Sequence, residues 1–358
     1  MRPRVLSFGS LSSPLARNQA QRVIDALQET SPRVTCQLNL LPSPVPAAAK
    51  VDEPFLTACR AEVEFLGASI LREEIRLVVL EASDMAAPLP QDLAIICVPD
   101  RVTPFDAFLN RQGLIMDEMD PGSSVGVLSL RSRAQMQRLW PNLGFRVLRG
   151  GAELAMETHM RKSEIDGLVM PASVTELLGI QGIVAEIFSP DFVLPGPGQG
   201  IQVVVGHAGD HEARELLAGL HSDATAAELT AEHAFFRRMV SDQDLPIGAL
   251  ARVEGGSIVI TGTTGSGTTR VAVDGRIEQA EAVGNGLATQ ILNSVESFAD
   301  LLEADFPDGL PEDDALGNGE IGDDPEAELE ELERMRDLEN LAGIVRSDDD
   351  PENERYDS

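Results

Sequence analysis

Residues 125–150, VGVLSLRSRAQMQRLWPNLGFRVLRG, indicate the class of fold to which this chain belongs. The segment 123–130 predicts a strand followed by a turn, 131–140 predicts a helix, and 144–150 predicts a second strand. Alternation of strand and helix is typical of a parallel sheet that carries helices on both faces. We therefore expect an α/β unit around this stretch.

The same alternation extends in both directions from this stretch. The strands expected around it are 4–9, 33–41, 75–82, 92–99 and 165–172, and the helices are 15–30, 55–74, 153–164 and 173–180. A new set of elements begins near Asp106. Two similar α/β units in succession predict a cleft between them.

The last third of the folded region has a different pattern. The breaker-rich turn in LPGPGQGIQVVVGH (194–207) leads into a buried strand, and a helix is expected over 223–240. Residues 249–275 alternate and turn as an antiparallel sheet does, and a helix follows over 284–304. We expect three domains: α/β domain 1 from 1–97 with 201–221, α/β domain 2 from 102–195, and a small α+β domain from 222–302.

The charge of the chain is strongly negative and uneven. The 358 residues carry a net charge of −31, and from Glu303 onward there are 22 acids against 4 bases. An acidic surface disfavours binding to nucleic acid and to anionic membranes, and aromatic residues for stacking on bases make up only 4%. We expect residues 303–358 to form a largely disordered acidic tail.

The cysteines and histidines show no metal-ligand spacing. Cys36, Cys59 and Cys97 form no CxxC pair, and with no signal peptide this predicts reduced thiols in a cytoplasmic protein. His207 and His211 are four residues apart, but the glycines around them favour a loop that ends in a helix cap, so no metal is expected. The stretch TGTTGSGTT lacks the lysine of a phosphate loop and predicts a hairpin turn.

Two groups of polar residues lie where strands are expected to end. Asp84 follows the strand 75–82, at the edge where open α/β sheets bind ligands. The alternative is a helix or turn cap, which the spacing alone favours. Ser129, Arg131 and Arg149 lie at the strand ends of the second unit, with Arg133 close by. A turn of this type offers N–H groups, a hydroxyl and a guanidinium to a carboxylate. The alternative is an ordinary set of surface arginines.

Taken in order, these segments resemble the hydroxymethylbilane synthase family, also called porphobilinogen deaminase. The similarity runs from Ser7 to Asp300 and is strongest in residues 125–150, in LPGPGQG (194–200) and in TAEHAFFRRMVSDQDLPIGALA (230–251). The resemblance implies two α/β domains like those of type II periplasmic binding proteins, and a third α+β domain.

The resemblance also implies an activity and a cofactor. Members of this family join four porphobilinogens, with release of ammonia, on a dipyrromethane primer bound to a cysteine thioether. The family loop typically reads GGCQVPIG, and this chain has SDQDLPIG, so Gln243 stands at the cysteine position. An amide is not a usable nucleophile for this bond.

Several family residues are retained at matching positions. Asp84 matches the catalytic carboxylate that stabilises charge on the pyrrole nitrogen. The matching cofactor-binding positions are Ser13, Ser129, Arg131, Arg149, Gln199 and Gly200.

The cationic lining that the family uses for acetate and propionate groups is reduced. The substituted positions hold Leu11, Ser83, Ser132, Ala155 and Leu177, where the family has four arginines and one lysine. A charge-assisted hydrogen bond contributes about 1.5–3 kcal/mol. These substitutions therefore predict a loss of several kcal/mol in polyanion binding.

Three functions remain open from the sequence. The first is a catalytically impaired member of the family, a monomer that binds a small anionic pyrrole or tetrapyrrole in its cleft. The second is a divergent but active deaminase. The third is an interaction module that works through its acidic tail.

Overall fold

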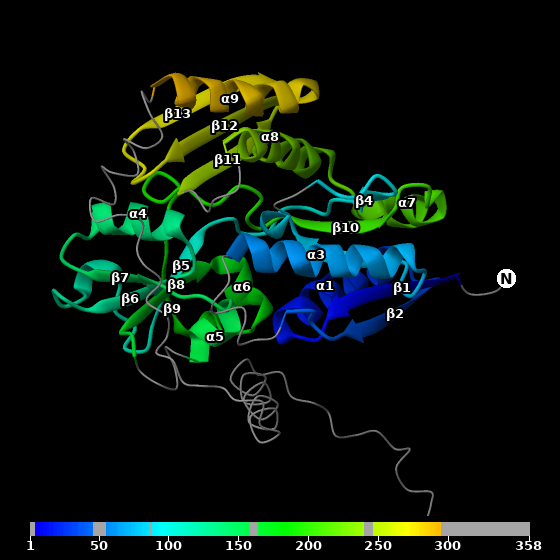
Figure 1. Ribbon diagram of the computed structural model, residues 1–358, viewed down its shortest axis with the longest axis horizontal. Helices are drawn as coiled ribbons and strands as arrows, with labels where there is room; N and C mark the ends of the chain where they lie inside the picture. The colour runs from blue at the N-terminus through cyan, green and yellow to red at the C-terminus, as the bar shows by residue number, and fades with distance from the viewer. Residues whose placement is uncertain (1–3, 46–54, 86–87, 158–163, 240–245, 295–358) are drawn as a thin grey trace, which may run out of the picture.

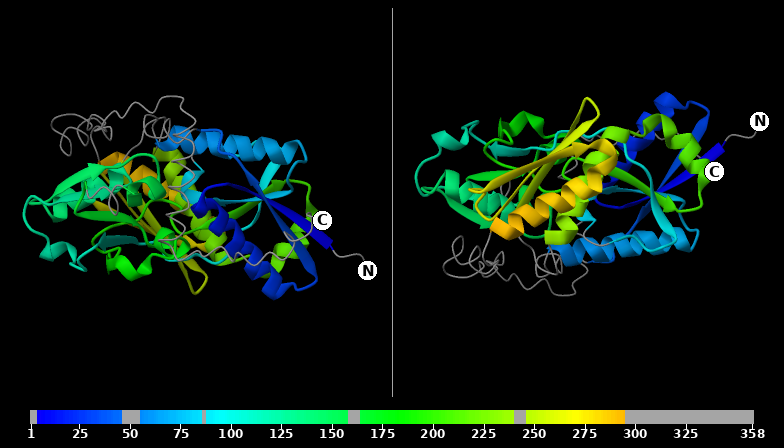
Figure 2. Two further views of the ribbon diagram at one scale, coloured as in Figure 1. Left: turned by 90° about the horizontal axis from the view of Figure 1, so that it is seen from below. Right: turned by 90° about the horizontal axis from the view of Figure 1, so that it is seen from above.

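The computed structural model describes residues 4–45, 55–85, 88–157, 164–239 and 246–294. Two α/β domains lie side by side, and a smaller domain lies above both of them (Figure 1). The views from below and from above show the same pairing of the α/β domains (Figure 2). The expected fold class of two α/β domains and one α+β domain is therefore confirmed.

The first sheet has the strand order β2-β1-β3-β10-β4. Its strands are β1 (Arg4–Leu11), β2 (Val34–Leu41), β3 (Leu77–Glu81), β4 (Leu93–Cys97) and β10 (Gln202–His207). Strand β10 is antiparallel to both of its neighbours, β3 and β4. The chain therefore returns to the first sheet after it has built the second.

Helices cover both faces of this sheet. One face packs against α1 (Pro14–Thr30) and α7 (His211–Leu217), and the other packs against α3 (Phe55–Leu71). Asp210 caps α7, as the loop around His207 and His211 predicts, because its side chain accepts a hydrogen bond from Ala213 N.

The second sheet has the order β7-β6-β8-β5-β9, with β5 antiparallel to β8 and β9. Its strands are β5 (Asp106–Asn110), β6 (Ser124–Val127), β7 (Gly144–Val147), β8 (Gly167–Pro171) and β9 (Val184–Ile187). Helix α4 (Leu130–Leu139) covers one face, and α5 (Ala152–Glu157) and α6 (Ala172–Leu177) cover the other. The stretch that predicted a strand, a helix and a strand thus forms β6, α4 and β7.

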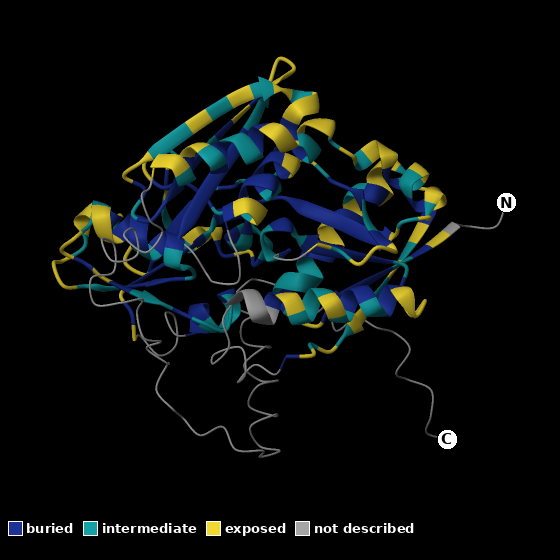
Figure 3. Ribbon diagram, turned by 45° about the horizontal axis from the view of Figure 1, so that its top comes forward, coloured by how far each residue is buried: buried dark blue, intermediate teal, exposed yellow. Residues whose placement is uncertain are grey.

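The third domain is a three-stranded antiparallel sheet under two helices. The strands are β11 (Ile247–Glu254), β12 (Ser257–Thr264) and β13 (Arg270–Arg276), and the helices are α8 (Asp223–Met239) and α9 (Ala280–Ser294). The glycine- and threonine-rich stretch (261–269) forms the end of β12 and the turn into β13. Buried residues concentrate in central strands such as β5 and β10, whereas β13 carries only intermediate and exposed residues (Figure 3).

Strand β1 is longer than the sequence pattern indicated. Ser10 and Leu11 continue the strand because they pair with Leu40 and Leu41 of β2. Leu11 is consequently part of the core of the first domain.

The domain boundaries given above stay predictions, and the acidic tail and Gln243 lie outside the described residues.

Candidate functional site

Two passages of the chain connect the α/β domains, and they lie against each other. One follows β4 and the other precedes β10, and Val102 N donates to Gly200 O at 2.9 Å. Gly200 has φ +77, and a Cβ there would lie 3.0 Å from Pro104 Cα and from Thr103 O. A glycine is needed because the two backbones approach this closely.

Arg131 and Gln199 meet at this junction, as neighbours in one buried network. The Arg131 guanidinium donates to Asp106 Oδ2 at 2.8 Å and to Leu194 O at 2.8 Å. It also donates to Gln199 Oε1 at 3.3 Å, and Gln199 Nε2 donates to Asp106 Oδ1 at 2.9 Å. Arg131 is only 6% exposed, so these bonds give it a structural role at the domain junction.

The retained serines are both helix caps. Ser13 caps α1 and accepts a hydrogen bond from Ala16 N, and Ser129 caps α4 and accepts one from Ser132 N. A serine oxygen at this place satisfies an amide that the helix leaves unpaired. The two serines therefore start helices that begin at the carboxyl ends of β1 and β6.

Asp84 lies just past the end of β3, in the 3-10 turn Ala82–Asp84. The turn is held from the third domain, because His233 Nε2 is 3.0 Å from Ala82 O. Burial lowers the pKa of His233, so its neutral form is favoured in this contact. Asp84 is thus placed at the strand edge predicted from the sequence.

Glu81 is a carboxyl group of this site that the sequence interpretation did not select. It is the last residue of β3, and its Oε1 accepts a hydrogen bond from Gly200 N at 2.7 Å. Burial, and then the nearby negative charge of Asp84, raise the pKa of Glu81 to about 8. Two carboxyl groups, those of Glu81 and Asp84, therefore lie at the end of β3.

Most of the positions at which this chain lacks the cations of the family are buried. Leu11 is 8% exposed, Ser132 is 3% exposed and Ala155 is 0% exposed. Leu11 packs in the core of the first domain and Ala155 in that of the second. Ser83 and Leu177 are half-buried, and so is Arg149, which follows β7 and is retained.

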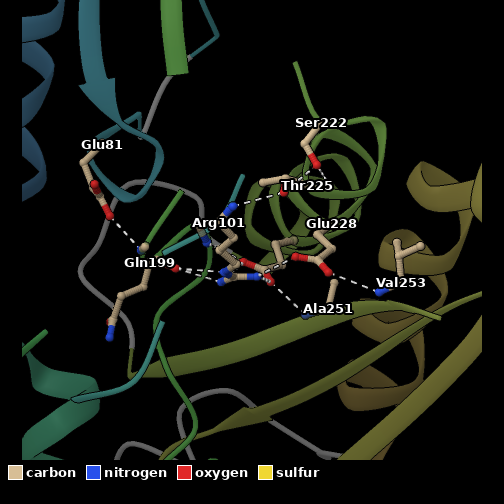
Figure 4. Close-up of polar contacts among 11 residues, drawn as sticks. Glu81, Arg101, Gln199, Ser222, Thr225, Glu228, Ala251 and Val253 are labelled. Carbon is tan, nitrogen blue, oxygen red and sulfur yellow. Dashed lines mark hydrogen bonds and ion pairs between the residues drawn. The ribbon is translucent and has the colours of Figure 1, made fainter. Parts of the chain in front are cut away.

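A second buried network joins this junction to the third domain (Figure 4). Arg101 donates to Glu232 Oε1 at 2.6 Å and to Gln199 O at 2.8 Å. Glu232 also accepts from Gly198 N at 2.6 Å and from Ala251 N at 2.7 Å. The carboxylate of Glu232, on α8, therefore holds the junction loop and β11 together through these hydrogen bonds.

The three thiols of the chain belong to elements of the first domain, β2, α3 and β4. Cys97 packs in the core of the first domain, where burial raises the pKa of its thiol to about 12. Burial also raises the pKa of Cys36, and Cys59 is buried in α3. A thioether bond forms from a thiolate, and these three cysteines are the only ones in the chain.

The comparisons with known proteins identify the family. The family model "Porphobilinogen deaminase, dipyromethane cofactor binding domain" matches residues 6–215. The chain belongs to the porphobilinogen deaminase family. The porphobilinogen deaminase of Roseiflexus castenholzii is 30% identical over 81% of this chain and 96% of its own. That of Thermus thermophilus is 31% identical over 81% of this chain and 96% of its own.

Among solved structures, the methionine binding protein MetQ has a TM-score of 0.40 and 12% identity, over 61% of this chain and 90% of that one. No helix of the described residues is long and apolar enough to cross a membrane. Over the same residues, no group of three or more His, Cys, Asp and Glu has the arrangement of a metal site.

Proposed function

We propose that this member of the porphobilinogen deaminase family binds a pyrrole or tetrapyrrole in its cleft without assembling the tetrapyrrole chain. The burial of Leu11 and Ala155, at 8% and 0% exposure, carries the proposal. Arginines at these two positions would line a polyanion site, whereas here the side chains are part of two apolar cores. Compared with the family pattern, the cleft thus has fewer cations to bind the carboxylates of a growing chain.

The attachment chemistry supports the same proposal. Gln243 stands at the cysteine position, and the chain's three thiols are placed in the first domain, at β2, β4 and α3. Without a thioether, a primer is held only by reversible contacts. A dipyrromethane held in this way dissociates at a rate set by its affinity, whereas a covalent primer does not.

The experiment measures the intact mass of the purified protein and its reaction with Ehrlich's reagent. We expect the mass of the bare chain, no coloured adduct and no consumption of porphobilinogen. Binding of porphobilinogen by calorimetry then tests the cleft directly. A covalent dipyrrole, or consumption of porphobilinogen by the unmodified protein, contradicts the proposal.

A divergent active deaminase is the second candidate, and Asp84 favours it. The carboxylate is retained beyond the end of β3, where it can stabilise positive charge on a pyrrole nitrogen. Asp84→Asn distinguishes the candidates. It abolishes consumption of porphobilinogen in an active enzyme, and in a binding protein it changes only the affinity.

A further inference from the structure

Gln202 is a buried side chain with an unused hydrogen-bond donor. It is 5% exposed, and among the described residues its Nε2 has no hydrogen-bond partner. Buried polar groups are nearly always paired, because an amide removed from water without a partner costs free energy. This donor therefore needs an acceptor that the described part of the chain does not supply.

Gln202 and Glu81 lie side by side at one end of the first sheet. Gln202 begins β10 and pairs directly with Glu81, the last residue of β3, because the two strands are antiparallel. Opposite residues of such a pair put their side chains on the same face, with Cβ atoms about 5 Å apart. Val79 and Val204, the next residues of this face, belong to the core under α1 and α7. The unused donor thus lies beside the Glu81 carboxyl group, at the sheet edge where open α/β sheets bind ligands.

Glu81 supplies a second donor. Its Oε1 accepts from Gly200 N at 2.7 Å, which leaves Oε2 to carry a proton. Burial, and then the negative charge of Asp84, raise the pKa of Glu81 to about 8, so the carboxyl group keeps this proton at neutral pH. The side chain is half-buried, and a ligand can therefore reach it. Together, Glu81 Oε2 and Gln202 Nε2 offer two donors to one acceptor oxygen.

The cations that act on this carboxyl group are already paired with carboxylates of the protein. They are Arg101, which pairs with Glu232 at 2.6 Å and with Glu228 at 3.5 Å, and Arg22, which lies 3.6 Å from Glu176. A ligand carboxylate at this site would have to compete for either of them. An uncharged acceptor needs no cation.

Asp84 adds a negative charge close to Glu81. This charge opposes a ligand carboxylate and favours an N–H group, whereas the two donors favour a carbonyl oxygen. A lactam, which is an amide within a ring, carries N–H and C=O side by side. We propose that Glu81 and Gln202 bind the carbonyl oxygen of a lactam on the pyrrole ligand. The inference rests on the proposed function for the existence of a pyrrole ligand, and it adds the group by which that ligand is recognised.

The test compares porphobilinogen with porphobilinogen lactam by calorimetry on the full chain. In the lactam, the aminomethyl and acetate groups have condensed with loss of water to a neutral cyclic amide, and the propionate is kept. We expect the unmodified protein to prefer the lactam by about tenfold or more, as the gain of two neutral hydrogen bonds predicts. Gln202→Met fills a similar space without a donor and should lower this preference about threefold or more. Gln21→Met, at an exposed glutamine of α1, is the control and should keep it.

The pH of the measurement gives a second readout. Glu81 holds its proton below a pKa of about 8 and loses it above. We therefore expect the preference for the lactam to fall between about pH 6 and about pH 9. Glu81→Gln keeps an acceptor for Gly200 N and a donor for the ligand at both pH values, so its preference should not change. A preference that falls equally in the unmodified protein and in Glu81→Gln would contradict the role of Glu81.

The stability of the free protein tests the unused donor without a ligand. Gln202→Met removes a buried amide that lacks a partner, so we expect a melting temperature equal to that of the unmodified protein or higher. A loss of several degrees would mean that the amide is hydrogen-bonded within the protein, and it would overturn the proposal.

The outcomes separate this inference from the proposed function. If porphobilinogen and its lactam bind equally, or if Gln202→Met keeps the full preference, the lactam site is wrong and the proposed function stands. If the unmodified protein consumes porphobilinogen, the proposed function fails, while a preference lowered by Gln202→Met still supports the lactam site. If neither probe binds to any variant, both proposals fail.

Discussion

Arg101 Nη1 lies 2.6 Å from Glu232 Oε1, and their side chains are 5% and 0% exposed. The two residues come from the passage between the α/β domains and from helix α8. Glu228 adds a second carboxylate at 3.5 Å from the same guanidinium. This buried cation therefore pairs with two carboxylates of α8 and helps to attach the third domain to the domain junction.

Arg101→Met leaves Glu228 and Glu232 buried without their cation. Removing one partner of a buried ion pair typically costs about 3–5 kcal/mol, and we expect a loss of this size in the free energy of unfolding. Urea denaturation measures it. Arg72→Met is the control, because Arg72 and Glu74 form an exposed pair, and exposed ion pairs contribute little to stability. Equal effects of the two substitutions would contradict this role of Arg101.

Glu81 makes stability depend on pH. Its folded-state pKa of about 8 lies above the unfolded value, which is near 4.3. The folded protein therefore holds the proton more tightly, and stability from this group is lost as pH rises from the unfolded value through about 8. The carboxyl group is desolvated although the side chain keeps some exposed surface, so we expect a loss on the order of 2 kcal/mol.

Glu81→Gln removes this pH dependence and keeps an acceptor for Gly200 N. Urea denaturation at about pH 5 and about pH 9 should show the unmodified protein losing stability relative to the variant. Glu254→Gln, at an exposed residue, is the control and should follow the unmodified protein. Parallel pH profiles for Glu81→Gln and the unmodified protein would show that Glu81 is ionised throughout.

Gly200→Ala tests the close approach of the two passages. The substitution puts a Cβ into a backbone with φ +77, at 3.0 Å from three atoms of residues 102–104. We expect a loss of about 2 kcal/mol or more in stability. Gly219→Ala is the control, since a Cβ there meets nothing within 4 Å. A melting temperature for Gly200→Ala equal to that of the control would contradict the argument.

Gln243→Cys by itself does not restore turnover of porphobilinogen. The thiol supplies an attachment atom, but Leu11 and Ala155 remain apolar, at 8% and 0% exposure. The intact mass shows whether a dipyrrole becomes attached, and consumption of porphobilinogen shows whether the chain grows. Turnover by this single variant would mean that the missing cations are not needed.

The sequence by itself determined the family and most of the strands and helices, although β5 and β9 were not among the strands expected. Hydrophobic periodicity is a local property, so it specified α1, α4 and β10 within a few residues. The pattern did not show that β1 continues to Leu11, because that extension depends on pairing with Leu41 of β2.

Only the tertiary structure decided what the polar residues contact. Arg131 and Asp106 are 25 residues apart, Arg101 and Glu232 are 131 apart, and Leu15 and Glu153 are 138 apart. No local pattern identifies such partners, because packing of the sheets and of the third domain brings them together. The same packing desolvates the carboxyl group of Glu81 beside Asp84 and buries Ala155 in the core of the second domain. Sequence therefore specified which groups are present, and the fold determined which of them meet.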